Sequence, residues 1–512
     1  MTVTAPAPPA RDPRLDRLAL GLVAAATALH VLYAGLLALS PQEAYYWTWS
    51  RDLSRSYFDH PPLAAWTIRA FTAPFGDSER AIRLAAAFHS AVFAGFLWAA
   101  VRRLFGSRAA LAAMVAGLSV LLFGLGQVII TPDGPLLSGW AMALYFTVRA
   151  LDEEQPRWLL AAGAATGWAM LGKYTGGLLL PQILAVLVFD PRGRRMLATP
   201  WPWLGAVLAF LLFSPVVLWN AEHHFASFGF QTAERAHASR LRPVLVGRFL
   251  GLQTLLVSPL MLVVLVEAVV QAFRRRAEAP WRVCFWFAAP LLLLAAVISP
   301  FHWVKGNWLA PAYPAALAAA AALWVGGGVW RRRAGIAAVA VALAFSVYMH
   351  LVPVLPGLWF PSPRDEGSAG WRELAARVEA ERAALPEGAF VAGCNYKVSA
   401  ELGYYLPGRP RTWSGEIAGD HGLQYRFWFE PSELAGRTGL VVRDGREKKT
   451  CLRLPEACTT LQPLPPLTVL RGEAKVTTFE LWRCEGYRGP PAAEASAKQD
   501  QDSVGSRGPP HP

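Results

Sequence analysis

The stretch that decides the fold runs from residue 18 to residue 66. Residues 18–40, LALGLVAAATALHVLYAGLLALS, are apolar over the length that an α-helix needs to cross the hydrocarbon of a bilayer. Residues 42–66, QEAYYWTWSRDLSRSYFDHPPLAAW, then bring a carboxylate, two arginines, an Asp-His pair and two adjacent prolines before another apolar run begins. Charged groups are costly at membrane depth, so this segment is a functional candidate at a membrane boundary.

The rest of the chain repeats the apolar pattern. Of its 512 residues, 54% are hydrophobic and only 17% are charged, which predicts a mainly α-helical protein that crosses the membrane several times. About eleven spans are expected, at 17–40, 81–103, 108–127, 134–151, 157–172, 174–190, 201–219, 248–273, 281–299, 308–329 and 334–356.

The basic residues indicate the orientation of these spans. The net charge of +13 comes largely from arginines in the connections after even-numbered spans and before span one, rather than from a surface suited to nucleic acid. By the positive-inside rule these connections are cytoplasmic, which places the odd-numbered connections and the C-terminus outside. The clusters are Arg11, Arg14 and Arg17; Arg102, Arg103 and Arg108; Arg192, Arg194 and Arg195; Arg274, Arg275 and Arg276; Arg331, Arg332 and Arg333.

Four segments follow from this pattern. Residues 1–16 are expected to be a loose cytoplasmic segment that leads into an uncleaved first span, and 17–358 the transmembrane part. Residues 362–487 combine an amphipathic stretch at 371–385 with three short strand patterns, AFVAGC, TGLVVRD and VTTFELWRC, and predict a small α/β domain outside the membrane. Residues 488–512 are polar and Pro-rich and predict a disordered tail.

Cysteine usage agrees with that sidedness. Cys284 falls inside a predicted span, whereas Cys394, Cys451, Cys458 and Cys484 all fall in the predicted outer domain. An oxidising compartment favours disulfides, and four cysteines allow three complete pairings that sequence alone does not separate. The local pair Cys451–Cys458 is the one we favour, with buried free thiols as the alternative.

The predicted outer connections hold most of the membrane-proximal acids, histidines and lysines. A site built from several of these loops on one face of the membrane explains this distribution. In the first loop, a helical projection places Glu43 on one side and Tyr45 and Trp49 on the other, which predicts an interfacial helix with aromatics toward lipid and Glu43 toward a cavity. The loops are 41–80, QVIITPDGP at 127–135, LGKYTGG at 171–177, the polar stretch 219–243 and SPFHWVKGNW at 299–308.

At these motifs the chain resembles the polyprenyl-phosphate-sugar-dependent glycosyltransferases of the GT-C fold, in the branch of the protein O-mannosyltransferases and lipid A aminoarabinose transferases. The resemblance covers roughly residues 17–487 and rests on the order, spacing and shared sidedness of QEAYYW, YFDHPP, TPDGP, GKYTGG, WNAEHHFASFGFQ and HWVKGNWLAPAYP. It implies a multi-span enzyme with its site on the outer face, a C-terminal outer domain, and a donor sugar carried by a polyprenyl phosphate.

Two positions depart from the family pattern. Gln42-Glu43 stands where the family commonly has Asp-Glu, so the role of a base falls on Glu43. Asp59-His60 stands where the aminoarabinose branch has Glu-Lys, so the cation there is a histidine, whose charge depends on its pKa.

The chemistry assigns roles to the polar loop residues. A sugar on a lipid phosphate already carries a leaving group, so the enzyme holds the donor, stabilises charge on the departing phosphate and orients or deprotonates the acceptor. The expected catalytic carboxylates are Glu43, Asp133 and Asp59, the expected phosphate-binding cations are Lys173, His60 and Lys305, and the expected substrate contacts are Tyr46, Trp219, Asn220 and His224. No nucleotide motif, metal constellation or cofactor site is evident in the sequence.

The motifs and the resemblance therefore predict a glycosyltransferase of a bacterial plasma membrane, in contact with membrane lipids. Its expected donor is a lipid-linked sugar, and its expected acceptor is a glycan, a lipid or a protein. Two alternatives come from other classes: a polysaccharide ligase or polymerase, and a lipid-linked sugar transporter. Transporters often show repeated halves with a site at mid-membrane, whereas here no repeat is evident and the polar groups collect at one face. The sequence names neither the sugar nor the acceptor.

Overall fold

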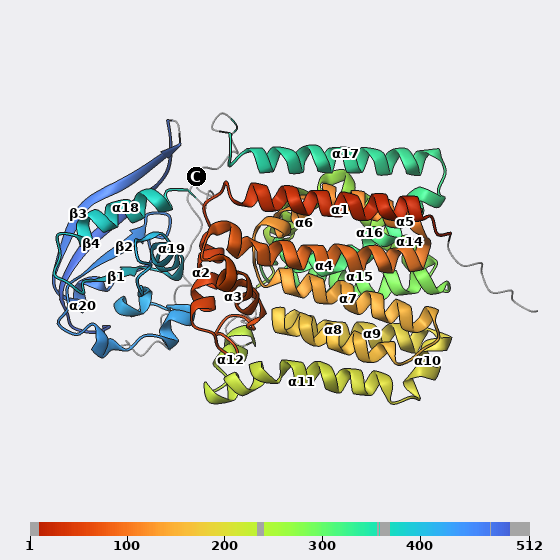
Figure 1. The fold of residues 1–512 in the computed structure, drawn as a ribbon, viewed down its shortest axis with the longest axis horizontal. Helices are drawn as coiled ribbons and strands as arrows, with labels where there is room; N and C mark the ends of the chain where they lie inside the picture. Colours follow the sequence, from red (N-terminus) through yellow and green to blue (C-terminus); the bar gives the residue numbers. More distant parts are fainter. Residues whose placement is uncertain (1–9, 233–239, 356–357, 359–368, 472, 492–512) are drawn as a thin grey trace, which may run out of the picture. The chain divides into compact units, whose positions relative to one another are not determined.

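The computed structural model describes residues 10–232, 240–355, 358, 369–471 and 473–491 (Figure 1). The chain forms two compact units. The first comprises residues 1–37 and 49–359, and the second comprises residues 38–48 and 360–512. The predicted tail lies outside the described residues from position 492 onward, as do the first nine residues of the predicted N-terminal segment.

The first unit is a helical bundle, and helix α2 (Pro41–Arg51) begins in the second unit and ends in the first. Its other helices are α1 (Pro13–Ala34), α3 (Leu63–Phe75), α4 (Glu79–Phe105), α5 (Ser107–Ser119), α6 (Leu121–Val128), α7 (Asp133–Asp152), α8 (Trp158–Gly172), η1 (Tyr174–Leu178), α9 (Leu179–Phe189), α10 (Pro191–Leu197), α11 (Trp201–Glu222), α12 (Ala226–Thr232), α13 (Pro243–Val257), α14 (Pro259–Arg274), α15 (Ala279–Ile298), η2 (Gly306–Ala312), α16 (Tyr313–Gly326) and α17 (Val329–Leu351).

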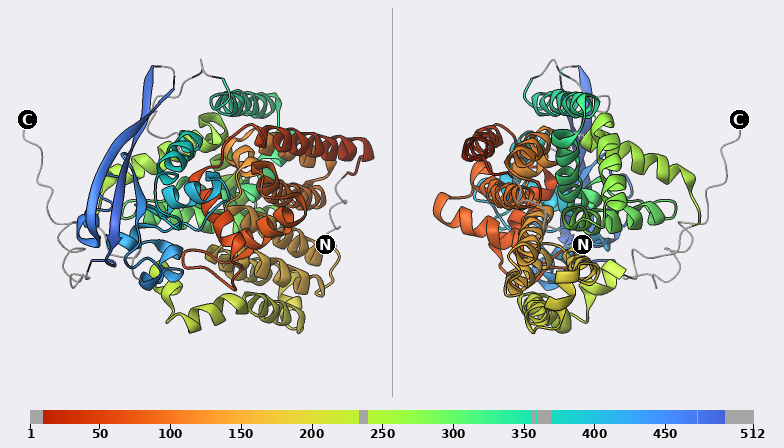
Figure 2. Two further views of the ribbon diagram at one scale, coloured as in Figure 1. Left: turned by 60° about the vertical axis from the view of Figure 1, so that its left-hand side comes forward. Right: turned by 90° about the vertical axis from the view of Figure 1, so that its right-hand side faces the viewer.

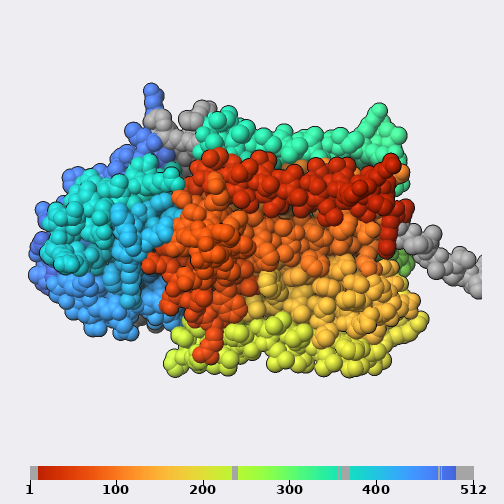
Figure 3. Space-filling view, viewed as in Figure 1, coloured from red at the N-terminus to blue at the C-terminus, as the bar shows by residue number. Residues whose placement is uncertain are grey.

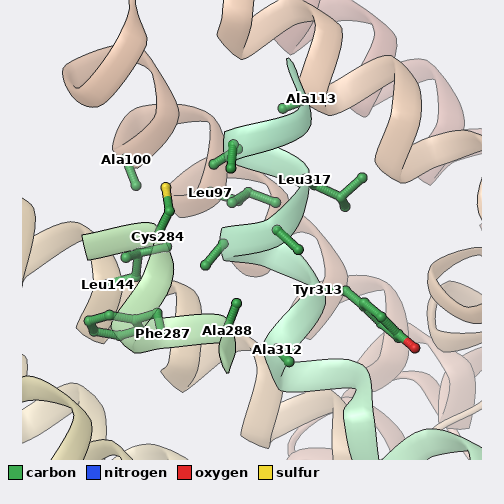
Figure 4. Packing of buried hydrophobic residues seen from close by; sticks show 14 of the residues in the cluster. Leu97, Ala100, Ala113, Leu144, Cys284, Phe287, Ala288, Ala312, Tyr313 and Leu317 are labelled. Atoms are coloured by element: carbon green, nitrogen blue, oxygen red, sulfur yellow. The ribbon is translucent and has the colours of Figure 1, made fainter. Parts of the chain in front are cut away.

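Small residues let these helices approach closely. Helices α4, α7, α8 and α11 pack side by side in that order (Figure 1). Where α8 meets α11, a Cβ added to Gly163 would come within 2.0 Å of the carbonyl oxygen of Gly205, so only glycine permits this backbone contact. Alanines of α16 belong to one buried cluster with Leu97, Leu144 and Phe287, and Cys284 is buried in the same cluster (Figure 4).

The bundle carries the features of an integral membrane protein. Six of its described helices are long and apolar enough to cross a membrane, and nine spans result if each of three bent pairs counts as one. These nine coincide with nine of the eleven predicted spans, and the other two coincide with α7 and with the shorter apolar helix α8. The count of eleven stays a prediction, because broken and short helices do not fix where the chain leaves the bilayer.

Two helices expose apolar side chains along the surface of the bundle. Leu29 and Leu32 of α1 are more than half exposed, and Ile336 of α17 is 70% exposed. Figure 3 shows α1, in red, open along its length on this face. Soluble proteins rarely expose such contiguous apolar surface, so these faces fit contact with lipid tails.

The second unit is built on a four-stranded sheet in the order β1-β2-β4-β3, in which β1 and β2 are parallel and the other pairs antiparallel. The long β3–β4 hairpin is visible in blue in Figure 2. Its elements are α18 (Trp371–Arg382), β1 (Phe390–Gly393), α19 (Tyr396–Tyr405), η4 (Gly415–Ala418), η5 (Leu423–Phe427), η6 (Pro431–Glu433), β2 (Gly439–Asp444), α20 (Leu454–Ala457), β3 (Cys458–Arg471) and β4 (Ala474–Tyr487).

The helix and the three strands that the sequence indicates in this region match α18, β1, β2 and β4. Strand β3 was not anticipated, because its segment contains Pro463, Pro465 and Pro466, which argue against a strand. The strand tolerates its prolines because β3 lies at the edge of the sheet, and because Pro465 and Pro466 fall in a register shift between Leu464 and Leu467.

Two disulfides join elements of the second unit, Cys394–Cys451 and Cys458–Cys484. The favoured local pair Cys451–Cys458 is therefore wrong. Cys458 begins β3 and lies beside β4, so its nearest partner comes from across the hairpin rather than from the preceding loop. Cys451 instead reaches Cys394, which directly follows β1.

One buried acid in this unit has a displaced protonation equilibrium. Glu416, in η4, is 7% exposed and accepts a hydrogen bond from the backbone N–H of Ser414 through Oε1. Burial disfavours the charged carboxylate and raises the pKa of Glu416 to about 7, although the backbone hydrogen bond opposes the shift. The acid consequently titrates near neutral pH.

Candidate active site

Asp133 lies at the centre of a polar cluster in the bundle. It is the first residue of α7, where a carboxylate is favoured by the positive end of the helix dipole. Its Oδ1 accepts a hydrogen bond from Lys173 Nζ at 2.8 Å, and its Oδ2 accepts one from Asn307 Nδ2 at 2.6 Å. We call Asp133, Lys173 and Asn307 the Asp133 site. It joins three loops that the sequence places on the outer face.

Lys173 is positioned by a break between two helices. It ends α8 in an extended conformation, and the 3₁₀ helix η1 begins at the next residue. A Cβ on Gly172 would come within 2.7 Å of the backbone nitrogen of Leu136, and one on Gly176 within 2.5 Å of the backbone of Ala169. These glycines of the GKYTGG motif therefore let η1 and α7 press against α8, which holds the lysine beside Asp133.

Asn307 comes from η2, two residues after Lys305. Lys305 is exposed, whereas the Asn307 amide is partly buried against Asp133. Sequence reasoning missed Asn307, because it weighed charged groups and passed over an amide in the same motif. The signal that could have identified it is its place in an outer loop directly after the Lys-Gly step.

An apolar cavity opens beside the Asp133 site. Its volume is about 340 Å³, and Asp133 and Asn307 line one part of it together with His89 and Thr131. The remaining walls are almost entirely apolar and come from α1, α4, α5, α6, α7, α13 and η2. Lining residues include Val23, Phe93, Leu97, Leu118, Leu122, Leu137, Leu252 and Leu256. The cavity thus joins a polar pair to a hydrocarbon-like interior.

Further contacts link the remaining outer loops to this cluster. The Tyr174 hydroxyl, one residue after Lys173, hydrogen-bonds to the Ser227 hydroxyl of α12. Gln231 of α12 donates from Nε2 to the carbonyl oxygen of Asp59 at 2.6 Å. With the contacts of Asp133, these hydrogen bonds connect all five predicted outer loops at one end of the bundle, which sequence spacing alone did not establish.

The other predicted residues of the fourth loop have local structural contacts. Asn220 is fully buried, donates to the carbonyl oxygen of Val216 and accepts from the backbone N–H of Phe228. Trp219 is buried and stacks on the imidazole of His223 with ring centroids 4.0 Å apart. His224 is exposed in a left-handed turn with a φ of 53°. Their substrate-binding roles stay predictions.

The first loop places Asp59 and His60 just before α3. Asp59 is 7% exposed, and His60 is partly buried and followed by the two prolines that lead into α3. The His60 carbonyl accepts a hydrogen bond from the Tyr57 N–H at 3.3 Å, which closes a tight loop. The roles of Asp59 as a carboxylate and His60 as a cation stay predictions.

Glu43 and Tyr46 belong to the second unit. Glu43 is fully buried at the start of α2, where its Oε2 accepts hydrogen bonds from the backbone N–H of Ser40 at 3.0 Å and from the Ser40 hydroxyl at 3.1 Å. Ser40 and Glu43 thereby form a capping box, a structural task that the catalytic prediction did not include. Tyr46 is 4% exposed.

The structure contradicts the prediction that the aromatic residues Tyr45 and Trp49 of α2 face lipid. Tyr45 is fully buried: its ring packs against Tyr396 at 4.6 Å between centroids, and its hydroxyl accepts from the backbone N–H of Gln424. Trp49 is also fully buried and stacks on Tyr57 with ring centroids 4.3 Å apart. The helical projection separated two faces of the helix, but protein side chains cover the face that was predicted to meet lipid.

Among the described residues, no group of three or more His, Cys, Asp or Glu side chains gathers as metal ligands would. The Asp133 site supplies one carboxylate, one paired ammonium and one amide beside the apolar cavity, and the cavity lining adds the imidazole of His89 and the amide of Gln127.

The chain is similar in sequence to known glycosyltransferases over part of its length. Residues 59–219 match the family model described as dolichyl-phosphate-mannose-protein mannosyltransferase. The lipid A galacturonosyltransferase RgtD of Rhizobium johnstonii is 27% identical over 278 residues, which is 53% of this chain and 58% of RgtD. The match therefore spans less than two thirds of that relative's length.

Solved structures extend the likeness to the whole fold. The crystal structure of ArnT from Cupriavidus metallidurans aligns with a TM-score of 0.62 at 18% identity, over 93% of this chain and all of ArnT. Its form bound to undecaprenyl phosphate aligns with a TM-score of 0.63 at 17% identity over the same shares. The matches confirm the resemblance to the GT-C glycosyltransferases, and the fold of the chain is similar to that of ArnT.

Proposed function

We propose that the protein is a membrane glycosyltransferase that moves a sugar from a polyprenyl-phosphate donor to an acceptor outside the cytoplasm. The observation that carries the proposal is the apolar cavity that ends at the Asp133 site. A polyprenyl phosphate is a long hydrocarbon with one charged group, and this cavity offers hydrocarbon walls next to a fixed carboxylate–ammonium pair.

The donor phosphate binds by taking the place of Asp133 as the ion-pair partner of Lys173. Lys173 and Asp133 are only 13% and 15% exposed, so an arriving phosphate meets an ammonium that is already desolvated and oriented. A cation held in this way stabilises the charge that grows on the phosphate as the bond to the sugar breaks. Exposed Lys305, two residues from Asn307, and His60 are the further cations that we assign to the phosphate.

The acceptor hydroxyl attacks the sugar carbon as the lipid phosphate departs, and its proton passes to a carboxylate. We keep Glu43 as the first choice for this base, with Asp133 and Asp59 as the others. Both carboxylate oxygens of Asp133 accept hydrogen bonds, one from Lys173 and one from Asn307. We therefore assign Asp133 to orienting Lys173 and releasing it to the phosphate, rather than to proton transfer. Tyr46, Trp219, Asn220 and His224 keep their proposed role in substrate contact.

We further propose that the second unit lies outside the cytoplasm and that the membrane is the inner membrane of a bacterium. The two disulfides of the second unit support its placement in an oxidising compartment. The named activity of RgtD supports lipid A as the acceptor class. A protein hydroxyl or another glycan are the other classes, and the identity of the sugar is open.

A transfer assay tests the proposal. The purified full-length protein in detergent is incubated with undecaprenyl-phosphate sugars of several kinds and with lipid A, without a membrane gradient. We expect transfer from at least one donor, and loss of that transfer in Lys173→Ala. A transporter would give no product in detergent, and a ligase would need a lipid-diphosphate donor, so activity only with a diphosphate donor would contradict the proposal.

A further inference from the structure

A second cavity lies among the arginine-rich connections of the bundle. Its volume is about 1070 Å³. Four arginines line it, one from each of the four clusters that follow even-numbered predicted spans: Arg103, Arg192, Arg275 and Arg331. Residues spread over more than 200 positions of sequence thus bring their guanidinium groups to one space, which we call the arginine cavity.

The lining of this cavity has more arginines than acids. Two acids, Asp152 and Glu278, lie among its lining residues beside the four arginines. Acids outside the lining also pair with three of these arginines: Glu153 with Arg103, Asp190 with Arg192 and Glu267 with Arg331. Arg103 pairs with Asp152 at 2.6 Å, and Arg275 pairs with Glu278 through two contacts of 2.9 Å. The Arg275–Glu278 pair is about half exposed on both sides, so its attraction is weak and an incoming anion can replace the glutamate at little cost.

The other walls are apolar. They include Leu104 and Phe105 from the end of α4, Val148 and Leu151 from α7, and Leu323 from α16. The cavity therefore places a ring of guanidinium groups next to hydrocarbon-like side chains. Helix α15 begins here at Ala279 without a side-chain cap, which adds backbone N–H groups and a positive helix end to the same space.

We propose that the arginine cavity binds the phosphate of an anionic phospholipid from the membrane leaflet nearest the arginine-rich connections. A guanidinium group offers paired donors that match phosphate oxygens, and basic pockets between membrane helices suit anionic headgroups. The apolar walls accept the first part of the acyl chains, which a free phosphate ion would leave unused. The cavity is distinct from the apolar cavity at Asp133, with which it shares no lining residue.

The experiment measures lipid binding by the full-length protein. Native mass spectrometry from detergent counts retained phosphatidylglycerol and, as the neutral-headgroup comparison, phosphatidylcholine. The lining variant carries Arg103→Gln, Arg275→Gln and Arg331→Gln. The matched control carries Arg108→Gln, Arg276→Gln and Arg333→Gln, which remove the same charge from the same connections but do not line the cavity. Thermal unfolding without added lipid verifies that both variants fold.

We expect wild-type protein and the control to retain phosphatidylglycerol over phosphatidylcholine, and the lining variant to lose about 100-fold in phosphatidylglycerol affinity. A conservative variant with three lysines should recover part of that loss, because charge is kept and the forked geometry is not. Equal losses in the control and lining variants would overturn the site and leave only general surface charge.

A separate arm distinguishes the source of the phosphate. Inorganic phosphate at millimolar concentration is added in place of lipid, and thermal stabilisation is recorded for wild type and the lining variant. No stabilisation by inorganic phosphate supports the phospholipid. Stabilisation by phosphate that disappears in the lining variant, without selective retention of phosphatidylglycerol, would overturn the lipid assignment in favour of a soluble phosphate ligand.

Discussion

Filling the apolar cavity should weaken donor binding without harming the fold. Gly126, in α6, lines this cavity, and a Cβ added there meets no heavy atom within 4 Å. The substitution Gly126→Leu therefore places an isobutyl group in open space inside the cavity. Leucine is also favoured over glycine in a helix by up to about 1 kcal/mol, so the free energy of unfolding should not fall.

The size of the effect follows from the displaced hydrocarbon. The isobutyl group excludes about four carbon atoms of a polyprenyl chain, and each buried methylene contributes about 0.8 kcal/mol. The loss is then about 3 kcal/mol, which corresponds to about a 200-fold weaker affinity for the donor lipid. Because the sugar is not touched, the Michaelis constant for the donor should rise much more than the turnover number falls.

The assay compares undecaprenyl phosphate binding and donor-dependent transfer in wild type, Gly126→Leu and a matched control. Gly95→Leu is that control: Gly95 is also helical, its added Cβ also meets nothing within 4 Å, and it does not line the cavity. The control should bind like wild type. Wild-type affinity in Gly126→Leu, or equal losses in both variants, would refute the assignment of the cavity to the donor chain.

Four further predictions address other parts of the molecule. Lys173→Ala should lower transfer by at least about 100-fold and Lys173→Arg should recover only part of it, since a planar fork does not replace a point charge; wild-type transfer in the alanine variant would reduce the lysine to a structural role. Glu43→Gln should lower turnover about 100-fold if Glu43 is the base, whereas Gln42→Glu should change it little; near-normal turnover in Glu43→Gln would leave only the capping box. Because the pKa of Glu416 is raised from 4.5 to about 7 in the folded protein, its contribution to stability is fully present below pH 4.5, and the free energy of unfolding should fall by about 3 kcal/mol as pH rises to 7. Thermal unfolding at both ends of this pH range should show the loss in wild type and not in Glu416→Gln. Replacing Cys484 by serine should destabilise the second unit by about 2–5 kcal/mol, measured by its unfolding midpoint under oxidising conditions, and a reducing agent should bring wild type to the same midpoint or below it, since it opens both bonds.

Much of the bundle could be predicted because its cause is local. Apolar runs of about twenty residues determine where membrane helices lie, and arginine clusters determine which connections share a side. The arginine cavity agrees with the second point, because it gathers one arginine from each of the four clusters that follow even-numbered predicted spans. The bent pairs were harder, because α5 and α6 are divided by a 72° bend within a run that sequence reads as continuous.

The sequence predicted the two charged residues of the candidate site and missed its neutral residue. Asp133 and Lys173 stand out because charge at a membrane boundary is rare, and the structure joins them at 2.8 Å. Asn307 carries no charge, so only its hydrogen bond to Asp133 reveals it. The cysteine pairing and the burial of the α2 aromatics depend on contacts between segments far apart in sequence, which periodicity does not encode.

The most direct test of the central claim is a structure of the full-length protein with undecaprenyl phosphate, determined by electron cryo-microscopy in a lipid nanodisc. We predict that the phosphate lies within hydrogen-bonding distance of Lys173 Nζ, with the isoprenoid chain in the apolar cavity against Phe93, Leu118 and Leu122. The phosphate of undecaprenyl phosphate bound in the arginine cavity instead of at Lys173, or its chain bound only on the outer surface of the bundle while the apolar cavity holds no lipid, would contradict it.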